Sequence, residues 1–237
     1  MILSLQIKDK IKNLALQNPN EEICGLFVKS GEYLDIYKCK NISSNKSEHF
    51  ELNPFDYLKA SKIGKIVGMW HTQEDENPSV LDYVVSSGHN IYSVIYSWKN
   101  DNFFEINEDI VKYSKYIGRH FELGKNDCYS LISDFYKNEY NIILKNYFRD
   151  DKTFNDEPDI INKHYKEEGF DKINIKDVKT GDAIVFGMTK TSVHIGIYIG
   201  KNTFLHHERD KYSTVTKLNS GWESKIVFCA RHKDKYE

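Results

Sequence analysis

The 237-residue sequence lacks the features of membrane-spanning and disulfide-stabilised proteins. No apolar run approaches the roughly 18 residues of a membrane span, and the first eight residues lack the order of a signal peptide. Only four cysteines are present and no two form a Cys-x-x-Cys pair, so neither a disulfide framework nor a thiolate zinc site is expected. We therefore expect synthesis in a cytoplasm and no membrane insertion.

An excess of one charge is also absent. Lys plus Arg is 33 and Asp plus Glu is 35, so the formal net charge is -2 and nothing attracts the chain to nucleic acid or to an anionic membrane. With 40% hydrophobic and 29% charged residues, the composition is that of a globular protein that can bury a core. The length allows one large domain or two compact ones.

The first hundred residues have the pattern of an α/β domain. Ile7, Ile11 and Leu14 lie at helical spacing and predict a helix that ends near Asn18-Pro19. Helices are also expected to begin at Pro54 and near Ser79. Strands are expected at 23–28, 33–37, 66–70 and 91–96. The stretch that follows is polar, so we place a domain at 1–106, a linker at 107–116 and a second domain at 117–237.

The second half has a different order, typical of an α+β domain. A helix is expected from Asp127 to Tyr140, and another near 157–168. Only strands are expected after these helices, at 181–186, 193–199, 203–207 and 224–230. Helices followed by strands, without alternation, predict helices segregated from an antiparallel sheet.

Cys128 has the sequence context of a reactive cysteine. The apolar residues after it recur at helical spacing, and Asp127 or Asn126 can cap the helix, so Cys128 is expected in the first turn. Unpaired N–H groups and the helix dipole stabilise a thiolate there, so we expect the pKa of the thiol to be lowered. A thiolate in this position would be a nucleophile.

Two histidines on predicted strands can complete such a site. His194 could act as a general base, and His206, twelve residues later across a predicted hairpin, is close enough to hold the first ring by a hydrogen bond. His207 is expected on the opposite face because strand side chains alternate. Residue types alone also allow a purely structural interpretation, with Cys128 in the core and the histidines bound to local partners. The spacing leaves both interpretations open.

Four separated blocks resemble the NlpC family of papain-like cell-wall peptidases. They are 118–131 (GRHFELGKNDCYSL), Gly181-Asp182, 194–200 (HIGIYIG) and 205–207 (LHH). The resemblance implies a papain-like fold with Cys128 as nucleophile, His194 as base and His206 as the orienting residue, without a cofactor. It also implies an assisting role for Tyr116, twelve positions before the cysteine.

The activity that this resemblance implies is hydrolysis of the γ-D-glutamyl to diamino acid bond in peptidoglycan peptides. The reaction is acyl transfer through a thioester, and the backbone N–H of Cys128 is the expected oxyanion donor. Acyl transfer to an acceptor other than water would use the same residues. The sequence does not separate these two reactions.

The Asp-Cys-Tyr-Ser-Leu form, the doubled histidine and Gly221-Trp222 resemble the members of this family that long-tailed phages use in tail tip assembly. The resemblance implies phage tail tip proteins as partners. It implies a location in the host cytoplasm during assembly, or at the virion tail tip with action in the periplasm or cell wall. A non-catalytic scaffold or chaperone that binds tail tip proteins is the alternative function.

The first domain resembles the JAMM (MPN) metalloprotease family. Glu22, His71, Ser79 and Asp82 match its glutamate acid/base, its first histidine ligand, its serine and its aspartate ligand, but Gln73 stands at the second histidine. A carboxamide is a poor zinc ligand, so we expect a remnant site of Glu22, His71 and Asp82 without metal, with a zinc site as the alternative. Ser79 with Asp82 three residues later is also an ordinary helix capping box.

Overall fold

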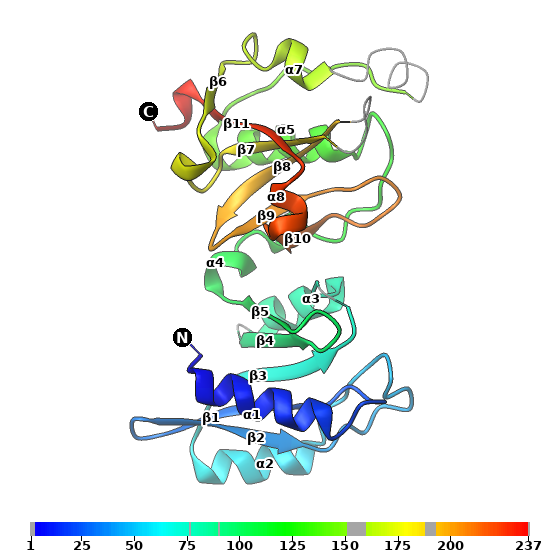
Figure 1. Cartoon of the computed structure of the whole chain (residues 1–237), viewed down its shortest axis with the longest axis vertical. Coiled ribbons are helices and arrows are strands. Elements are labelled where there is room, and N and C mark those ends of the chain that lie inside the picture. Colours follow the sequence, from blue (N-terminus) through cyan, green and yellow to red (C-terminus); the bar gives the residue numbers. More distant parts are fainter. Residues whose placement is uncertain (1–2, 76, 90, 151–159, 188–192, 237) are drawn as a thin grey trace. The chain divides into compact units, whose positions relative to one another are not determined.

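The structure, a computed structural model, describes residues 3–75, 77–89, 91–150, 160–187 and 193–236 (Figure 1). The chain forms two compact units, Met1–Ser114 and Lys115–Glu237. The predicted segment 107–116 is not an extended linker, because it contains α4 (Glu108–Val111) and a 3-10 turn, η1 (Ser114–Tyr116). This segment folds because its apolar side chains are buried: Ile110, Tyr113 and Tyr116.

The first unit is a five-stranded sheet with helices. Its elements before α4 are α1 (Leu5–Leu16), β1 (Cys24–Ser30), β2 (Tyr33–Cys39), α2 (Pro54–Ile63), β3 (Lys65–Gln73), α3 (Val80–His89), β4 (Tyr92–Ser97) and β5 (Asn102–Ile106). The strand order is β2-β1-β3-β4-β5. Strands β3 and β4 are parallel and α3 connects them, while the other neighbours are antiparallel. A parallel pair needs such a crossover.

Helices cover both faces of this sheet. Ile7, Ile11 and Ala15 form the apolar face of α1 and pack with Phe27 and Trp70 of the strands. The neighbouring strand residues point to the opposite face, where they pack with residues of α2 and α3. The members of this second cluster include Leu26, Val28, Met69, Ala60 and Val85. The first unit is therefore a helix–sheet–helix sandwich, as expected for an α/β domain.

The second unit is a six-stranded sheet in the order β10-β9-β8-β7-β11-β6, with antiparallel neighbours. Its helices are α5 (Cys128–Tyr140), α7 (Ile160–His164) and α8 (Ser220–Glu223). Its strands are β6 (Phe170–Ile173), β7 (Ala183–Gly187), β8 (Val193–Gly200), β9 (Thr203–His206), β10 (Thr214–Lys217) and β11 (Ile226–His232). Two 3-10 turns, η2 (Ile175–Asp177) and η3 (Lys233–Tyr236), flank the strands. This is the predicted α+β order.

Helix α5 packs against β8 and buries its apolar face (Figure 1). The buried residues of this helix are Leu131, Ile132, Phe135 and Tyr136. The other face of the sheet carries a cluster that includes Phe186, Phe204 and the half-buried Trp222 of α8. Because strand side chains alternate, Ile195 and His194 point to opposite faces of β8.

Several short elements were not predicted from the sequence. Strands β5, β6 and β10 and helices α4 and α8 have five residues or fewer, which is too short for a periodic pattern. The helix predicted at 157–168 is observed as α7 over Ile160–His164. Its residues before 160 lie outside the described part of the chain.

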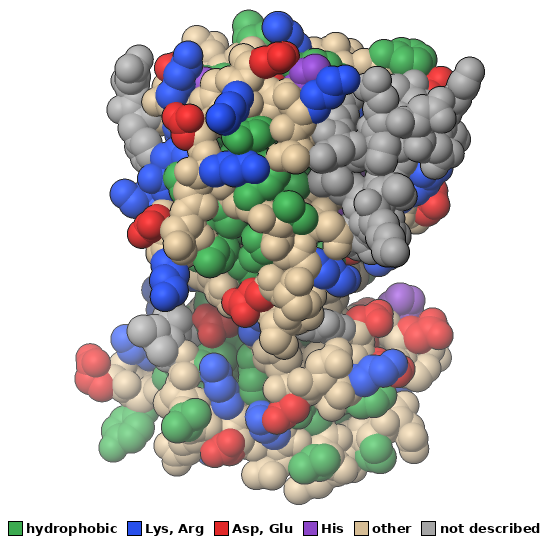
Figure 2. All heavy atoms as spheres, turned by 45° about the horizontal axis from the view of Figure 1, so that its top comes forward, with side chains coloured by type: hydrophobic (Ala, Val, Ile, Leu, Met, Phe, Trp, Pro, Cys, Tyr) green, Lys and Arg blue, Asp and Glu red, His purple; other side chains and the backbone are tan. Residues whose placement is uncertain are grey.

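In the part of the chain that the structure describes, no helix has the length and apolar character needed to cross a membrane. Lys and Arg side chains lie among Asp and Glu side chains on the face drawn in Figure 2. This mixed surface agrees with the balanced composition.

A buried ion-pair network joins the start of β7 to β11 and the C-terminal turn. Asp182 is fully buried and accepts hydrogen bonds from Arg231 Nη2 and Lys235 Nζ, both at 2.6 Å, and from Lys179 N at 2.7 Å. Burial alone would raise the pKa of Asp182, but the hydrogen bonds from Arg231 and Lys235 outweigh it and the pKa is lowered.

We predict that Asp182→Asn destabilises the second unit by about 3–5 kcal/mol at neutral pH, because the buried Lys235 and the half-buried Arg231 lose their anionic partner. Since the folded pKa lies below the ordinary value of 3.8, this contribution is present above that pH and is lost as the pH falls through the folded value. Urea denaturation at pH 7 and pH 3 measures both effects. Asp177→Asn, at an exposed position, is the matched control. Equal stability of the two variants at pH 7 would contradict the prediction.

Candidate active site

Cys128 is the first residue of α5, as the sequence predicts. Of the two possible caps, Asp127 is the one used: its Oδ1 accepts the backbone N–H of Ser130 at 2.8 Å. The thiol is half-buried, in contrast to the other three cysteines, which are buried. The start of the helix places this sulfur beside β8, where it accepts a hydrogen bond from the backbone of Ile195.

Arg149 fixes this helix start from a segment 22 residues further along the chain. Its Nε donates to Asp127 Oδ2 at 2.8 Å, and its Nη2 donates to Asp127 Oδ1 at 3.2 Å and to Ser130 Oγ at 3.1 Å. Gly124 N also donates to Asp127 Oδ2, at 2.8 Å. Both charged side chains are almost fully buried, with 6% of Arg149 and 1% of Asp127 exposed. Such a two-pronged pair restricts both position and rotation of the cap.

No sequence pattern predicts this pair. Arg149 follows a stretch without secondary structure, and neither spacing nor periodicity links it to Asp127. Burial alone would raise the pKa of Asp127, but the hydrogen bonds from Arg149 and from Ser130 N lower it. The cap is therefore a carboxylate, and its charge is neutralised in place by Arg149.

The pKa of the Cys128 thiol differs from the expectation. Burial raises it to about 12, and the neighbouring Asp127 carboxylate adds to the rise. Hydrogen bonds from the backbone of Ile195 and Tyr129, together with the Arg149 charge, act in the opposite direction without reversing the shift. The prediction of a lowered pKa was wrong because it considered the helix terminus and left out desolvation and Asp127. The resting sulfur is a thiol.

His194 and His206 form a directly hydrogen-bonded pair. His194 Nε2 lies 3.0 Å from His206 Nδ1, on the neighbouring strands β8 and β9. This confirms the predicted hydrogen bond between the two rings. His206 Nε2 in turn lies 2.8 Å from Thr216 Oγ1 on β10. Burial lowers the pKa of His194 to about 3 and that of His206 well below its ordinary value, so both rings are neutral at physiological pH.

Aromatic side chains hold both rings in place. The Trp222 ring lies 6.0 Å from the His194 ring and 5.1 Å from the His206 ring, measured between centroids. Phe204 packs on His206 at 4.5 Å. Gly196 makes this packing possible, because a Cβ there would lie 2.7 Å from Phe204 and 3.3 Å from the Cβ of His206. The glycine of the HIGIYIG block is therefore a close-approach position.

The structure brings Cys128 beside the strand segment that carries His194. The hydrogen bond from the Ile195 backbone to the sulfur places Cys128 next to the residue that directly follows His194. Within the described residues, no hydrogen bond joins the sulfur to the His194 ring. Because His194 Nε2 is bound to His206, proton exchange with the thiol would use His194 Nδ1.

Tyr116 is not brought to the cysteine. Its hydroxyl donates to Glu139 Oε1 at 2.7 Å, and its ring packs against Phe135 at 5.3 Å. Glu139 lies eleven residues after Cys128 on the same helix, which corresponds to about 16 Å along the axis. The geometry does not support the assisting role, and Tyr116 instead anchors the far end of α5.

His207 is a buried structural residue on the other side of β9. Its Nε2–H donates to the carbonyl of Lys211 at 3.1 Å, and its ring makes an edge contact with Phe121 at 5.3 Å between centroids. Burial lowers its pKa. Of the doubled histidine, only His206 bonds to His194 among the described residues.

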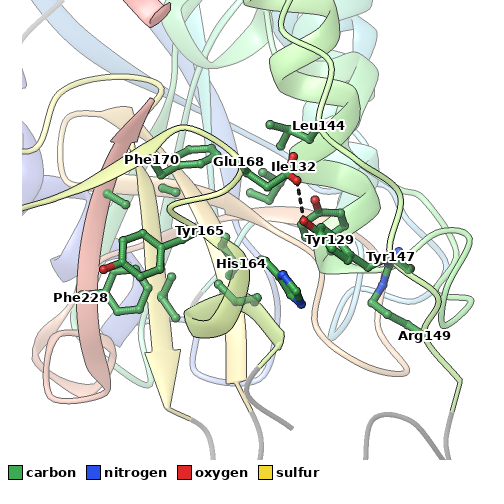
Figure 3. Close-up of a pocket in the computed structure, with 15 residues that line it drawn as sticks. Tyr129, Ile132, Leu144, Tyr147, Arg149, His164, Tyr165, Glu168, Phe170 and Phe228 are labelled. Atoms are coloured by element: carbon green, nitrogen blue, oxygen red, sulfur yellow. Dashed lines mark hydrogen bonds between the residues drawn. The ribbon is translucent and has the colours of Figure 1, made fainter. Parts of the chain in front are cut away.

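An apolar pocket lies behind the cysteine, between α5, α7 and strands β7, β8 and β11 (Figure 3). Its wall includes Tyr129 and Ile195, which follow Cys128 and His194 in the sequence. Figure 3 shows Tyr147 and Glu168 at its rim, where the tyrosine hydroxyl donates to Glu168 Oε1 at 2.5 Å. Neither Cys128 nor His194 lines this pocket.

The first unit gathers the residues of the expected remnant site. His71 Nε2 lies 3.1 Å from Gln73 Oε1 and 3.5 Å from Asp82 Oδ1. Asp82 Oδ2 accepts the N–H and the hydroxyl of Ser79, both at 2.7 Å, which confirms the capping box. Burial raises the pKa of Glu22 to about 8, with Asp82 the next contributor.

These residues do not fit a zinc ion. A carboxamide oxygen only accepts hydrogen bonds, so the proton of the neutral His71 ring lies on Nε2 and is donated to Gln73 Oε1. His71 Nε2 therefore has no lone pair with which to bind a zinc ion. The amide of Gln73 is used as well, since its Nε2 donates to the carbonyls of Asp75 at 3.0 Å and Asn77 at 2.8 Å. Across the described ranges, no cluster of three His, Cys, Asp or Glu residues is placed to hold a metal.

Comparison with known proteins gives the following matches. The model of the NlpC/P60 family matches residues 111–231, about half of the chain. Over 218 residues, 90% of this chain and 88% of the relative, the sequence is 26% identical to Tail tip assembly protein K of Escherichia phage N15. Over 118 residues, 49% of this chain and 58% of the relative, it is 25% identical to Tail tip assembly protein K of Escherichia phage lambda.

We predict that alkylation of Cys128 by iodoacetamide has no plateau near neutral pH. Because the pKa of the thiol is about 12, the thiolate fraction should rise tenfold per pH unit from pH 6 to pH 9. Mass spectrometry of the modified peptide measures the rate, and Cys24 and Cys229 in the same sample provide buried controls. A rate that levels off below pH 8 would show a lowered pKa and contradict the structure.

We also predict that the purified protein retains no stoichiometric zinc, because Gln73 occupies His71 Nε2. Metal analysis after dialysis against zinc measures this. Gln73→His should retain more zinc than the unmodified chain, since imidazole is the better ligand. One zinc per unmodified chain would overturn the interpretation of this cluster.

Proposed function

The chain belongs to the NlpC/P60 family, and on that basis we propose that it is a phage tail tip assembly protein whose second unit is a cysteine peptidase. The relative from phage N15, which matches along 90% of this chain, supports the assembly role. The peptidase role is supported by one observation above all: Cys128 begins a helix beside the strand of a buried, hydrogen-bonded histidine pair.

In the proposed reaction the thiol of Cys128 gives its proton to His194 Nδ1 as the sulfur attacks a peptide carbonyl carbon. The carbonyl oxygen becomes an oxyanion, which the backbone N–H of Cys128 stabilises. The C–N bond then breaks, and the leaving amine takes the proton back from His194. Water, with His194 again as base, hydrolyses the thioester to a carboxylate and restores the thiol.

The neutral resting pair determines how this reaction starts. With the thiol pKa raised to about 12 and the His194 pKa lowered to about 3, the sulfur and the ring do not form a stable ion pair before the substrate arrives. Proton transfer therefore accompanies the attack and does not precede it. We propose stem peptides of peptidoglycan as the substrate, with cleavage of the γ-D-glutamyl to diamino acid bond.

For the first unit we propose a JAMM/MPN-like domain with a degraded metal site. The convergence of His71, Asp82 and Ser79 at one place supports this assignment. The hydrogen bonds of Gln73 indicate a structural role for the cluster.

A non-catalytic scaffold for tail tip proteins is the second candidate function. The observation that favours it is the raised pKa of Cys128, which makes the resting sulfur a weak nucleophile. Both functions are compatible with the assembly role, so only an activity measurement separates them.

The test is digestion of purified peptidoglycan and of a stem tetrapeptide, with mass spectrometry to locate the broken bond. The unmodified chain is expected to cleave, and Cys128→Ala should lose roughly 10⁴-fold or all of this activity because the nucleophile is gone. His194→Ala should be nearly as severe. Cys39→Ala, a core substitution in the first unit, should retain activity.

Circular dichroism of each variant separates a loss of activity from a loss of fold. Turnover that survives Cys128→Ala would assign the hydrolysis to other residues. A folded, unmodified chain that cleaves neither substrate would overturn the peptidoglycan assignment and leave the scaffold function.

A further inference from the structure

The hydrogen-bonded chain that begins at His194 does not end at His206. His206 Nε2 lies 2.8 Å from the hydroxyl of Thr216, and 3% of Thr216 is exposed. Within the described residues, His206 is the hydrogen-bond partner recorded for this hydroxyl. Three buried side chains on three neighbouring strands, β8, β9 and β10, therefore form one continuous relay.

The sheet register explains how Thr216 reaches the ring. Thr216 pairs directly with Phe204, and Thr214 pairs with His206, so Thr216 is the diagonal neighbour of His206 on the same face. The His206 ring is packed between Phe204 and Trp222, with centroids at 4.5 Å and 5.1 Å. Because the ring is held by packing, its hydrogen-bonding pattern depends on which nitrogen carries the proton.

Two neutral arrangements satisfy the bond between the rings. In the first, His194 Nε2–H donates to His206 Nδ1, and His206 Nε2–H donates to Thr216 Oγ1. In the second, every bond is reversed: Thr216 donates to His206 Nε2, and His206 Nδ1–H donates to His194 Nε2. Only the first leaves a lone pair on His194 Nδ1, the ring nitrogen that is not bonded to His206.

The protonated state of His194 requires the first arrangement. An imidazolium carries a proton on both nitrogens, so its Nε2–H needs an acceptor, and His206 Nδ1 must then be bare. The single proton of neutral His206 must lie on Nε2, where the facing group is Thr216 Oγ1. An acceptor at this place therefore stabilises the state that follows removal of the thiol proton.

We propose that Thr216 is a positioning residue of this site: its hydroxyl accepts the His206 Nε2–H and so holds both histidines in the tautomer that makes His194 Nδ1 a base. The consequence for catalysis rests on the proposed Cys128–His194 chemistry, whereas the tautomers are properties of the folded protein alone. In this step the S–H bond breaks, the proton of the thiol ends on His194 Nδ1 and the sulfur bonds to the carbonyl carbon, while the hydrogen bonds to His206 and Thr216 stay as they are.

The test uses the full chain with ¹⁵N-labelled histidine and long-range ¹H–¹⁵N correlation spectra, which identify the protonated ring nitrogen. Signals are assigned by their loss in His194→Gln and His206→Gln. The unmodified protein should show Nε2–H tautomers for both residues. Thr216→Ser, which keeps the hydroxyl, should give the same spectrum. Thr216→Val, which keeps the shape, should shift His206 toward the Nδ1–H form.

The rate of stem tetrapeptide hydrolysis at pH 7.5 gives the functional readout, because the proposed turnover uses His194 Nδ1 as the base. Thr216→Val should lower it on the order of tenfold, and Thr216→Ser should restore the rate to within about twofold, since one buried hydrogen bond is lost and regained. Tenfold slowing with restored turnover in the serine variant is not expected of a residue that only fills space.

An Nδ1–H tautomer of either histidine in the unmodified protein would overturn this inference. So would a Thr216→Val variant whose histidine tautomers are those of the unmodified protein. Absence of peptide hydrolysis in all variants, together with the expected tautomers, would instead count against the proposed peptidase and leave the role of Thr216 in place. The two failures are thus distinguishable.

Discussion

The second unit depends on a single buried carboxylate at the start of its helix. Asp127 accepts from Gly124 N, from Ser130 N and from the guanidinium of Arg149, and these bonds join the loop before α5, the first helical turn and the stretch after the helix. Removing either partner would leave the other as an uncompensated buried charge, which is far more costly than the net value of the pair. The position of Cys128 follows from this arrangement.

The sequence predicted the framework of the fold well. Long helices such as the one that starts at Cys128 were predicted, because enough of their residues face the core for apolar side chains to recur at helical spacing. The four-residue β10 was missed with Thr216 on it, whereas the equally short β9 was predicted as part of a hairpin with β8. The short α4 was missed because Ile110 and Tyr113 are buried in a segment that is polar on average.

The site was predictable in part. Cys128, His194 and His206 were selected by their motifs and their catalytic roles stay predictions, whereas the bond between the two rings follows from strand pairing. Arg149 and Thr216 were not, because their partners are distant in sequence and no local pattern records a tertiary hydrogen bond. The pKa of Cys128 was predicted with the wrong sign, since helix position is visible in a sequence whereas desolvation is visible only once the chain is folded.

The residue that orients the His194 ring, His206, is an imidazole, where a carboxylate would also serve. At neutral pH the thiol, both rings and the threonine hydroxyl are all uncharged, and the nearest carboxylate is already paired with Arg149. Dissolved salt weakens interactions between charged groups, and these four side chains are uncharged, so their interactions with a ligand are little affected by salt. A ligand drawn to them must be recognised through shape and hydrogen bonds, and its affinity should barely change with ionic strength.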